Sequence, residues 1–215
     1  MIEALAFDLD CLLIDSEQVW DDVRERLARE RGGRWSDRAQ RDMMGMSSPE
    51  WSRYLHEVVG LREPPEVINA EVVRRMLERY EMDLPVVPGA VEAVRRLAAA
   101  GYRLAVASSS NRELIDAVLR RLELTSVFDV TVSSEEVARG KPAPDVYLET
   151  ARRLGVEPAR CAAIEDSGSG IRAAHAAGMR VIAYPNRHYP PAADVLALAD
   201  VVIESLSGLA VSVEA

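Results

Sequence analysis

Several features that would point to other classes of protein are missing from this 215-residue sequence. Its two cysteines, Cys11 and Cys161, form neither a CxxC pair nor a zinc spacing, so we expect reduced thiols in a cytoplasmic protein. No apolar run approaches the roughly 20 residues that span a bilayer, and the acidic start of the chain does not resemble a signal peptide. The net charge of -9 disfavours nucleic acid and anionic membranes as partners.

Lysine is also almost absent. Lys141 is the only lysine, and arginine supplies the rest of the 26 basic residues. Either chance accounts for this lysine, or its position requires a compact ammonium where a planar guanidinium does not serve. With 48% hydrophobic and 28% charged residues, the chain has enough apolar side chains for a core and a well-solvated surface. Because the chain is acidic, a small phosphorylated ligand would need a metal ion or local positive charge.

The pattern of secondary structure changes along the chain. Residues 2–8 are predicted to form a buried strand, and residues 16–84 carry helical patterns alone. Prolines and a glycine at 84–89 mark a linker, after which helix and strand alternate. Such alternation implies a parallel sheet with helices on both faces. We therefore predict an α/β, Rossmann-like core made of residues 1–15 and 85–215, with a small all-helical domain, 16–84, inserted after the first strand.

Polar side chains follow four of the predicted strands, where open α/β sheets bind their ligands. They are Asp8 and Asp10, then Ser108 to Asn111, then Ser133, Ser134 and Lys141, and finally Glu165, Asp166 and Ser167. Crowded carboxylates repel one another unless a cation lies among them, and hard oxygen ligands suit Mg²⁺. Lysine, hydroxyl groups and backbone N–H groups suit a phosphoryl group.

This combination predicts phosphoryl transfer. An aspartate can form an aspartyl-phosphate, and a carboxylate two residues later can exchange protons with the leaving group and the attacking water. Each element alone also has a structural interpretation: Asp8 and Asp10 as an acidic strand end, 108–110 as a helix-capping turn, and Lys141 as a solvated loop residue. Their joint occurrence at successive strand ends favours catalysis.

At this point the sequence resembles the haloacid dehalogenase superfamily, in its phosphatase and β-phosphoglucomutase-like branch. The resemblance covers essentially the whole chain and is carried by FDLDCLLIDSE at 7–17, VASSSN at 106–111, GKPAPD at 140–145 and IEDSGSGIRAAHAAGM at 164–179. It implies that the helical insertion, 16–84, is a cap domain that closes over the substrate and excludes bulk water.

The resemblance implies a role for each acidic residue of the site. Asp8 would attack phosphorus and also bind Mg²⁺. Asp10 would be the general acid/base, with its backbone carbonyl on the metal. Asp166 would bind the metal, with Glu165 beside it either as a further ligand or as a supporting neighbour.

The resemblance also assigns the groups that hold the substrate. Ser108, Ser109 and the neighbouring backbone amides would bind the phosphoryl oxygens, and Lys141 would neutralise charge between Asp8 and the phosphoryl group. The candidates for substrate contact in the cap are Gly45, Ser47 and Trp20. For Trp20 and for Trp51, packing inside the cap is the alternative interpretation.

Departures from the family pattern bear on the activity. Cys11 and Leu12 stand where the family usually has glycine and then threonine or valine. A thiol beside the site predicts a narrower entrance or sensitivity to oxidation. Asp10 argues against a true dehalogenase, and the absence of lysine from the cap argues against a phosphonatase.

Two positions favour hydrolysis over phosphoryl migration. Ser48 stands where β-phosphoglucomutases carry an arginine for a second phosphate, and Trp20 where they tend to carry histidine. We therefore expect a monomeric phosphatase for a small phosphorylated metabolite, a sugar phosphate or a similar monophosphate. A β-phosphoglucomutase-like mutase and a non-catalytic protein that binds phosphorylated ligands are the alternatives.

Overall fold

The structure is a computed structural model that describes residues 1–215 except 44–45, 187–188, 210–212 and 214–215. Its centre is a parallel sheet of six strands in the order β3-β2-β1-β4-β5-β6. The strands are β1 (Ala4–Phe7), β2 (Arg103–Ser108), β3 (Val130–Ser133), β4 (Cys161–Glu165), β5 (Arg180–Ala183) and β6 (Val201–Val202). The first strand, predicted over 2–8, agrees with these bounds to about two residues.

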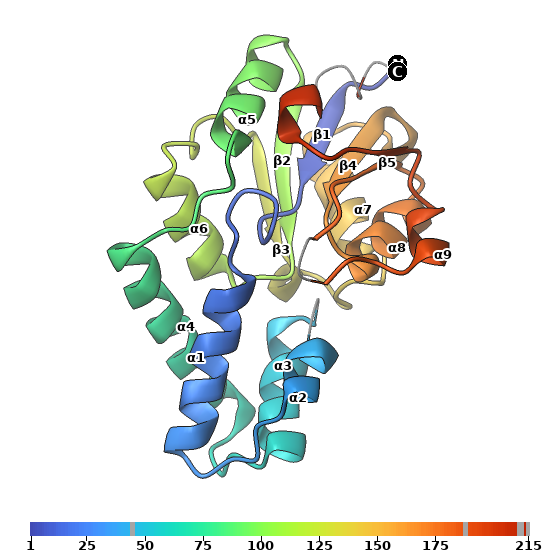
Figure 1. Ribbon diagram of the computed structural model, residues 1–215. Helices are drawn as coiled ribbons and strands as arrows, with labels where there is room; N and C mark the ends of the chain where they lie inside the picture. The colour runs from blue at the N-terminus through green and yellow to red at the C-terminus, as the bar shows by residue number, and fades with distance from the viewer. Residues whose placement is uncertain (44–45, 187–188, 210–212, 214–215) are drawn as a thin grey trace.

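Helices cover both faces of the sheet (Figure 1). Along β1, Leu5 and Phe7 point to one face, where they pack with α5 (Ala90–Ala99) and α6 (Arg112–Arg121). Ala4 and Ala6 point to the other, where they pack with α7 (Asp145–Leu154) and α8 (Gly168–Ala176). All four side chains are buried, because successive residues of a strand alternate between faces and both are covered. This confirms the predicted α/β, Rossmann-like fold.

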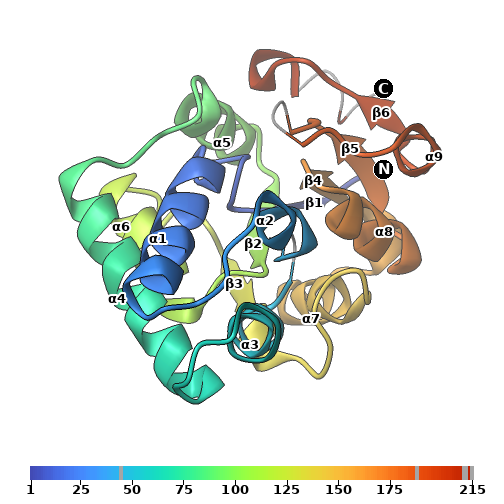
Figure 2. The ribbon, with the colours of Figure 1, turned by 60° about the horizontal axis from the view of Figure 1, so that its bottom comes forward.

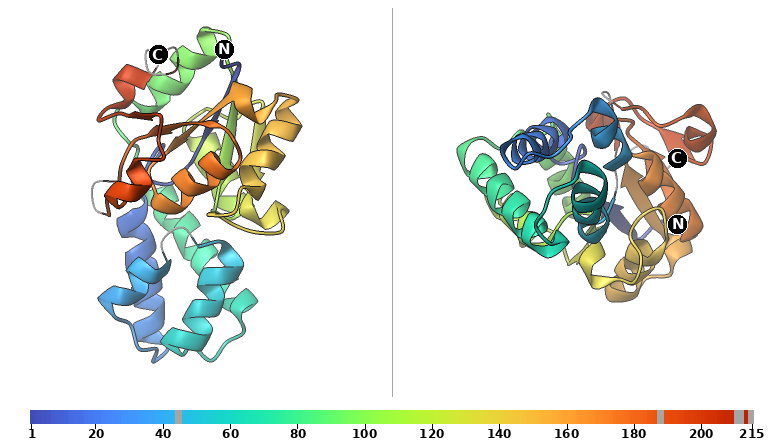
Figure 3. Two further views of the ribbon diagram at one scale, coloured as in Figure 1. Left: turned by 90° about the vertical axis from the view of Figure 1, so that its right-hand side faces the viewer. Right: turned by 90° about the horizontal axis from the view of Figure 1, so that it is seen from below.

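The segment between β1 and α5 forms a group of helices that we call the helical lobe. It contains α1 (Glu17–Glu30), α2 (Asp37–Met43), α3 (Ser48–Tyr54), the π-helical turn η1 (Leu55–Val59) and α4 (Pro65–Met82). The lobe lies at one end of the molecule (Figure 3), and α1 and α4 run side by side (Figure 2). The sequence showed only helical patterns over 16–84, and within this range the structure changes from α to π geometry after Tyr54.

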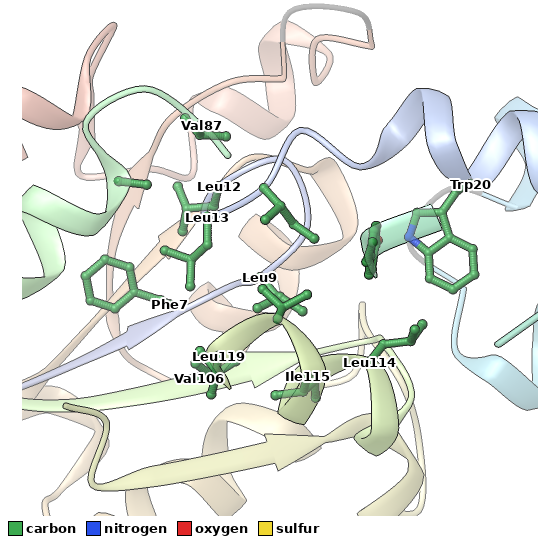
Figure 4. Close-up of a cluster of buried hydrophobic side chains, with 14 of the residues drawn as sticks. Phe7, Leu9, Leu12, Leu13, Trp20, Val87, Val106, Leu114, Ile115 and Leu119 are labelled. Atoms are coloured by element: carbon green, nitrogen blue, oxygen red, sulfur yellow. The ribbon is translucent and has the colours of Figure 1, made fainter. Parts of the chain in front are cut away.

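One apolar cluster runs from the sheet into the helical lobe. Figure 4 shows Leu9, Leu12 and Leu13 lying between Phe7 and the lobe residue Trp20. These leucines are almost fully buried, so apolar packing continues along the segment that joins β1 to the lobe.

Short elements complete the chain: the 3₁₀ turns η2 (Ser134–Glu136), η3 (Pro158–Arg160) and η4 (Leu206–Gly208), and the helix α9 (Ala193–Leu196). The sequence analysis did not predict them. None of the helices in the described ranges is both long enough and apolar enough to pass through a membrane.

Candidate active site

The carboxyl ends of the strands and the helical lobe enclose a cavity that we call the central cavity. Seven of the polar residues that the sequence analysis selected after the strands line it: Asp8, Asp10, Ser109, Ser110, Lys141, Asp166 and Ser167. The lobe contributes Glu17, Trp20, Arg24, Met43, Met46 and Trp51. Parallel strands end at one edge of the sheet, and this brings together residues that are far apart in the sequence.

Lys141 holds the centre of the site. Its Nζ donates to Asp8 Oδ1 at 2.7 Å, to Glu165 Oε1 at 2.6 Å and to the carbonyl oxygen of Ala107 at 3.0 Å. The side chain is buried, and burial alone would lower its pKa, but the charges of Asp8 and Glu165 raise the pKa above its usual value. Three acceptors therefore converge on one point, which suits a compact ammonium and not a planar guanidinium.

Asp8 and Asp166 lie together with little solvent around them. Oxygen atoms of Asp8, Glu165 and Asp166 all lie within 4.8 Å of one another. Burial raises the pKa of Asp8 to about 7, although the nearby Lys141 lowers it. Burial and the charge of Asp8 also raise the pKa of Asp166 well above its usual value. Such crowding of hard oxygen donors fits a divalent cation such as Mg²⁺, which would relieve the repulsion.

Asn186 supports Asp166 and was missed by the sequence analysis. Its Nδ2 donates to Asp166 Oδ2 at 3.1 Å, and its backbone N–H donates to the Asp166 carbonyl at 3.1 Å. Asn186 follows β5, so a search for polar residues after each strand could have found it.

Glu165 is held from several sides. Its Oε1 accepts from Lys141 and from the hydroxyl of Tyr147, and its Oε2 accepts from Ser167 Oγ at 3.3 Å. A Cβ atom at position 170 would lie 1.9 Å from Glu165 Oε2, so only Gly170 leaves room for this carboxylate. These contacts favour Glu165 as the supporting neighbour that fixes Lys141. Nothing in the sequence distinguished Tyr147 from the other core residues of its helix.

Asp10 lies between the sheet and the helical lobe. Its Oδ1 accepts from Ser16 Oγ at 2.5 Å and from Trp20 Nε1 at 3.0 Å, while its Oδ2 accepts from Ser110 Oγ at 2.5 Å. Both carboxylate oxygens are therefore oriented by neutral donors, as a proton-exchanging group requires. Trp20 packs edge-on against Trp51 with ring centres 5.9 Å apart, so it combines packing in the lobe with a contact to Asp10.

Comparison with known proteins agrees with this geometry. Residues 2–178 match the family described as haloacid dehalogenase-like hydrolase. The chain belongs to this family. The resemblance deduced from the four sequence motifs is thereby confirmed, and the protein is a hydrolase of the haloacid dehalogenase-like family.

Relatives of known name extend over most of the chain. Hexitol phosphatase B from Escherichia coli (strain K12) is 35% identical, and the match covers 97% of this chain and 94% of the relative. A bifunctional riboflavin kinase/FMN phosphatase from Arabidopsis thaliana is also 35% identical over 93% of this chain, but this chain spans only 52% of that protein. The crystal structure of CbbY from Rhodobacter sphaeroides in complex with phosphate matches with a TM-score of 0.83 and 28% identity, covering 97% and 96% of the two chains.

The serines after β2 have different environments in this haloacid dehalogenase-like hydrolase. Ser108 is fully buried, and its Oγ accepts from the backbone N–H of Ser110 at 3.0 Å. Ser109 lines the central cavity, and its buried Oγ has no hydrogen-bond partner among the described residues. The hydroxyl of Ser109 is thus open to a ligand oxygen, while that of Ser108 stabilises the turn.

Cys11 occupies the position where the family usually has glycine. Its φ of 57° is in the left-handed region, which is costly for a residue with a Cβ. The buried thiol donates to Glu17 Oε2 over 3.7 Å, and burial followed by the charges of Asp166 and Glu17 raises its pKa above the usual value. Thiolate is the form that reacts with oxidants, so this environment does not support the expected sensitivity to oxidation.

The substrate candidates in the lobe divide into three cases. Gly45 lies outside the described residues. Ser47 does not face the reacting groups, because its Oγ and backbone N–H donate to Glu50 Oε2 at 2.6 and 2.8 Å. Its Cβ also lies 2.9 Å from where a Cβ at Gly140 would be, so Ser47 packs the lobe against the loop before Lys141. Trp20 does line the central cavity.

Arg24 was not selected by the sequence analysis, although it lines the central cavity from α1. A signal for it exists. Arg24 follows Trp20 by four residues, which places a charged side chain on the buried face of an amphipathic helix.

Proposed function

We propose that this chain is a Mg²⁺-dependent phosphatase that hydrolyses a small phosphorylated metabolite through an aspartyl-phosphate on Asp8. The observation that carries the proposal is the Lys141 ammonium, held 2.7 Å from Asp8 Oδ1 and backed by Glu165, with Asp166 beside them. Relatives named as phosphatases support it, and they favour a sugar phosphate or similar monophosphate as the substrate.

The residues present fit a magnesium ion. Asp8 and Asp166 would hold it, together with the backbone carbonyl of Asp10 that the family resemblance implies. When bound, the ion supplies positive charge that stabilises the phosphoryl oxygens.

The chain's own residues account for the proton and bond changes. Asp8 attacks phosphorus as the bond to the ester oxygen breaks, and Asp10 gives its proton to that oxygen. Asp10 then takes a proton from water, which attacks phosphorus, breaks the bond to Asp8 and releases phosphate. Lys141 keeps the Asp8 carboxylate oriented and offsets the charge brought by the phosphoryl group, and Ser109 Oγ donates to one of its oxygens.

The organisation of the chain follows from this role. We assign residues 1–15 and 85–215 to the catalytic core and 16–84 to a cap that excludes water during the reaction. The lobe packs on the core through contacts such as Ser48 Oγ to Glu135 Oε1 at 3.1 Å. The buried free cysteines and the acidic charge support a monomer that works in the cytoplasm.

The proposal is tested by phosphate release from p-nitrophenyl phosphate and from sugar monophosphates, with Mg²⁺ and with EDTA. We expect release that requires Mg²⁺, and a loss of at least about 1,000-fold in kcat for Asp8→Asn, because an amide is a poor nucleophile. Asp15→Asn, at an exposed position seven residues later, is the matched control. Near-normal turnover by Asp8→Asn would exclude this mechanism.

The alternatives give different results in the same assays. A mutase would move the phosphoryl group between positions of a phosphorylated glucose, with little phosphate released. A non-catalytic ligand-binding protein would release none with any substrate.

A further inference from the structure

Arg24 is a buried cation that the proposed reaction does not use. It lies one helical turn after Trp20, and only 6% of its surface is exposed. Its guanidinium carbon lies 4.4 Å from the centre of the Trp20 ring and 4.9 Å from that of Trp51. The two indoles therefore fix the position of the guanidinium, and cation–π attraction favours this arrangement.

The hydrogen-bond donors of the Arg24 guanidinium are not all satisfied. Its Nε is buried without a hydrogen-bond partner, and in the described ranges Arg24 takes part in no ion pair. Burial lowers its pKa to about 10, so the group still carries its charge at neutral pH. Because buried charges are normally paired, an arginine that faces a cavity in this state indicates a ligand that supplies oxygen atoms.

The surrounding acids limit what that ligand can be. The acids Glu17, Asp10 and Asp21 lie near Arg24, and their charges act to raise its pKa against the effect of burial. Across the central cavity, four carboxylates (Asp8, Asp10, Glu17, Asp166) face two cations (Lys141, Arg24). A bound Mg²⁺ would only balance this excess, and the reacting phosphoryl group adds negative charge again. A second anionic group would therefore be repelled at the lobe end.

Glu17 supplies an acceptor close to this donor. It also lines the central cavity, and its carboxylate is positioned by Gln40 Nε2 at 2.6 Å and by the Cys11 thiol at 3.7 Å. A hydroxyl group can both accept from a guanidinium and donate to a carboxylate, which neither a phosphate dianion nor a carboxylate ligand can do.

We propose that Arg24 and Glu17 bind the hydroxyl groups at the non-reacting end of the substrate. The favoured substrates are then monophosphates of sugars or polyols, in preference to bisphosphates and phosphorylated acids. Met43 and Met46 complete an apolar wall against which the carbon chain lies. This assignment rests on the proposed phosphatase function and adds to it the residues that select the substrate.

The test compares sorbitol 6-phosphate with p-nitrophenyl phosphate, which carries the same reacting group and no hydroxyls. In Arg24→Met, we expect the ratio of kcat/KM for sorbitol 6-phosphate to that for p-nitrophenyl phosphate to fall roughly 10- to 100-fold, mainly through KM. Glu17→Gln lowers the same ratio by about 3- to 10-fold. Arg26→Met is the matched control, since Arg26 lies on the same helix with 66% of its side chain exposed, and it leaves the ratio unchanged.

Fructose 1,6-bisphosphate tests whether the lobe end accepts a second anionic group, because it carries a second phosphate. Wild type should use it less well than sorbitol 6-phosphate. A preference for the bisphosphate that disappears in Arg24→Met would overturn the assignment in favour of an anion site. An equal loss for both monophosphate substrates would also overturn it, because Arg24 would then only support Trp20 and Asp10.

Thermal unfolding shows whether Arg24→Met is folded. If it is not folded, the comparison uses Arg24→Lys and Glu17→Gln, because Arg24→Lys keeps the charge but loses the planar set of guanidinium donors. Failure of wild type to release phosphate from any of the three substrates would overturn the phosphatase function itself, and with it this assignment.

Discussion

The two ends of the central cavity hold their charges in opposite ways. At the sheet end, Lys141 contacts Asp8, Glu165 and a backbone carbonyl, so its charge and its three donors are all matched. At the lobe end, Arg24 lies against two indole rings with an unpartnered Nε. The cation at the sheet end is thus fully partnered without a substrate, whereas a substrate would supply the missing partner of the cation at the lobe end. This is the arrangement expected if the first performs the reaction and the second selects what reacts.

The origin of each end explains the difference. Side chains at the sheet end stand next to hydrogen-bonded strands, whose register fixes them in place. The lobe end is built from the faces of helices, and its attachment to the core runs through contacts such as Asn111 Nδ2 to Asn69 Oδ1 at 3.2 Å. Asp10 connects the two ends, because its carboxylate accepts one hydrogen bond from Ser110 of the sheet end and another from Trp20 of the lobe end.

The largest effect should come from a change at this meeting point. Asp10→Asn keeps the shape of the side chain but removes the proton that the leaving group needs. We expect kcat for sorbitol 6-phosphate to fall about 100-fold or more, and that for p-nitrophenyl phosphate to fall less, because p-nitrophenolate leaves without a proton. Steady-state kinetics on both substrates checks this. Equal losses would show that Asp10 acts by positioning and not by proton transfer.

A smaller effect should appear in thermal stability. The raised pKa of Asp8, about 7, and that of Asp166 mean that both groups stabilise the metal-free fold when protonated. For Asp8, that stability is fully present below its unfolded pKa near 4 and is lost as pH rises through about 7. The raised pKa of Asp166 acts in the same direction. Mg²⁺ should then raise Tm more at pH 8 than at pH 5.5, by roughly 3 °C or more.

The control for this pH dependence is Asp8→Asn, in which one of the two titrating groups is removed. Its Mg²⁺-induced change in Tm should differ less between pH 5.5 and pH 8 than that of wild type. The same Mg²⁺-induced rise in wild type at both pH values would contradict the assignment of Asp8 and Asp166 to the metal.

The smallest effect concerns Cys11, at the boundary between the two ends. Its thiol is buried with a raised pKa, and Cys161 is fully buried as well. A thiol reagent such as 5,5′-dithiobis(2-nitrobenzoate) should modify the native protein far more slowly than the unfolded one. Hydrogen peroxide should inactivate wild type and Cys11→Gly at rates within about twofold of each other. Faster inactivation of wild type would restore the idea of an oxidation-sensitive site.

Much of the sheet end could be predicted because its signals are local. Each strand is a short apolar run, and the polar residue that follows it in the sequence also follows it in space. Asp8, Asp10, Lys141 and Asp166 were found in this way, and all four line the central cavity. The same rule extends to Asn186, since β5 ends three residues earlier at Ala183.

The lobe end could not be predicted in the same way. An arginine was sought only after the loop serine, at Ser48, and its absence there favoured hydrolysis of a monophosphate. The structure brings Arg24 into the cavity from a different helix. The side chains of a helix point in all directions around its axis. The sequence alone therefore did not show which helix would face the cavity.

The sequence by itself determined the order of strands and helices, the family, and the acidic and basic groups at the strand ends, because those depend on neighbours along the chain. Only the tertiary structure decided that Ser109 and not Ser108 lines the central cavity, that Tyr147 and Gly170 support Glu165, and that Arg24 reaches the substrate side. These outcomes depend on how separately folded elements pack, which sets the burial and hydrogen-bond partners of each side chain.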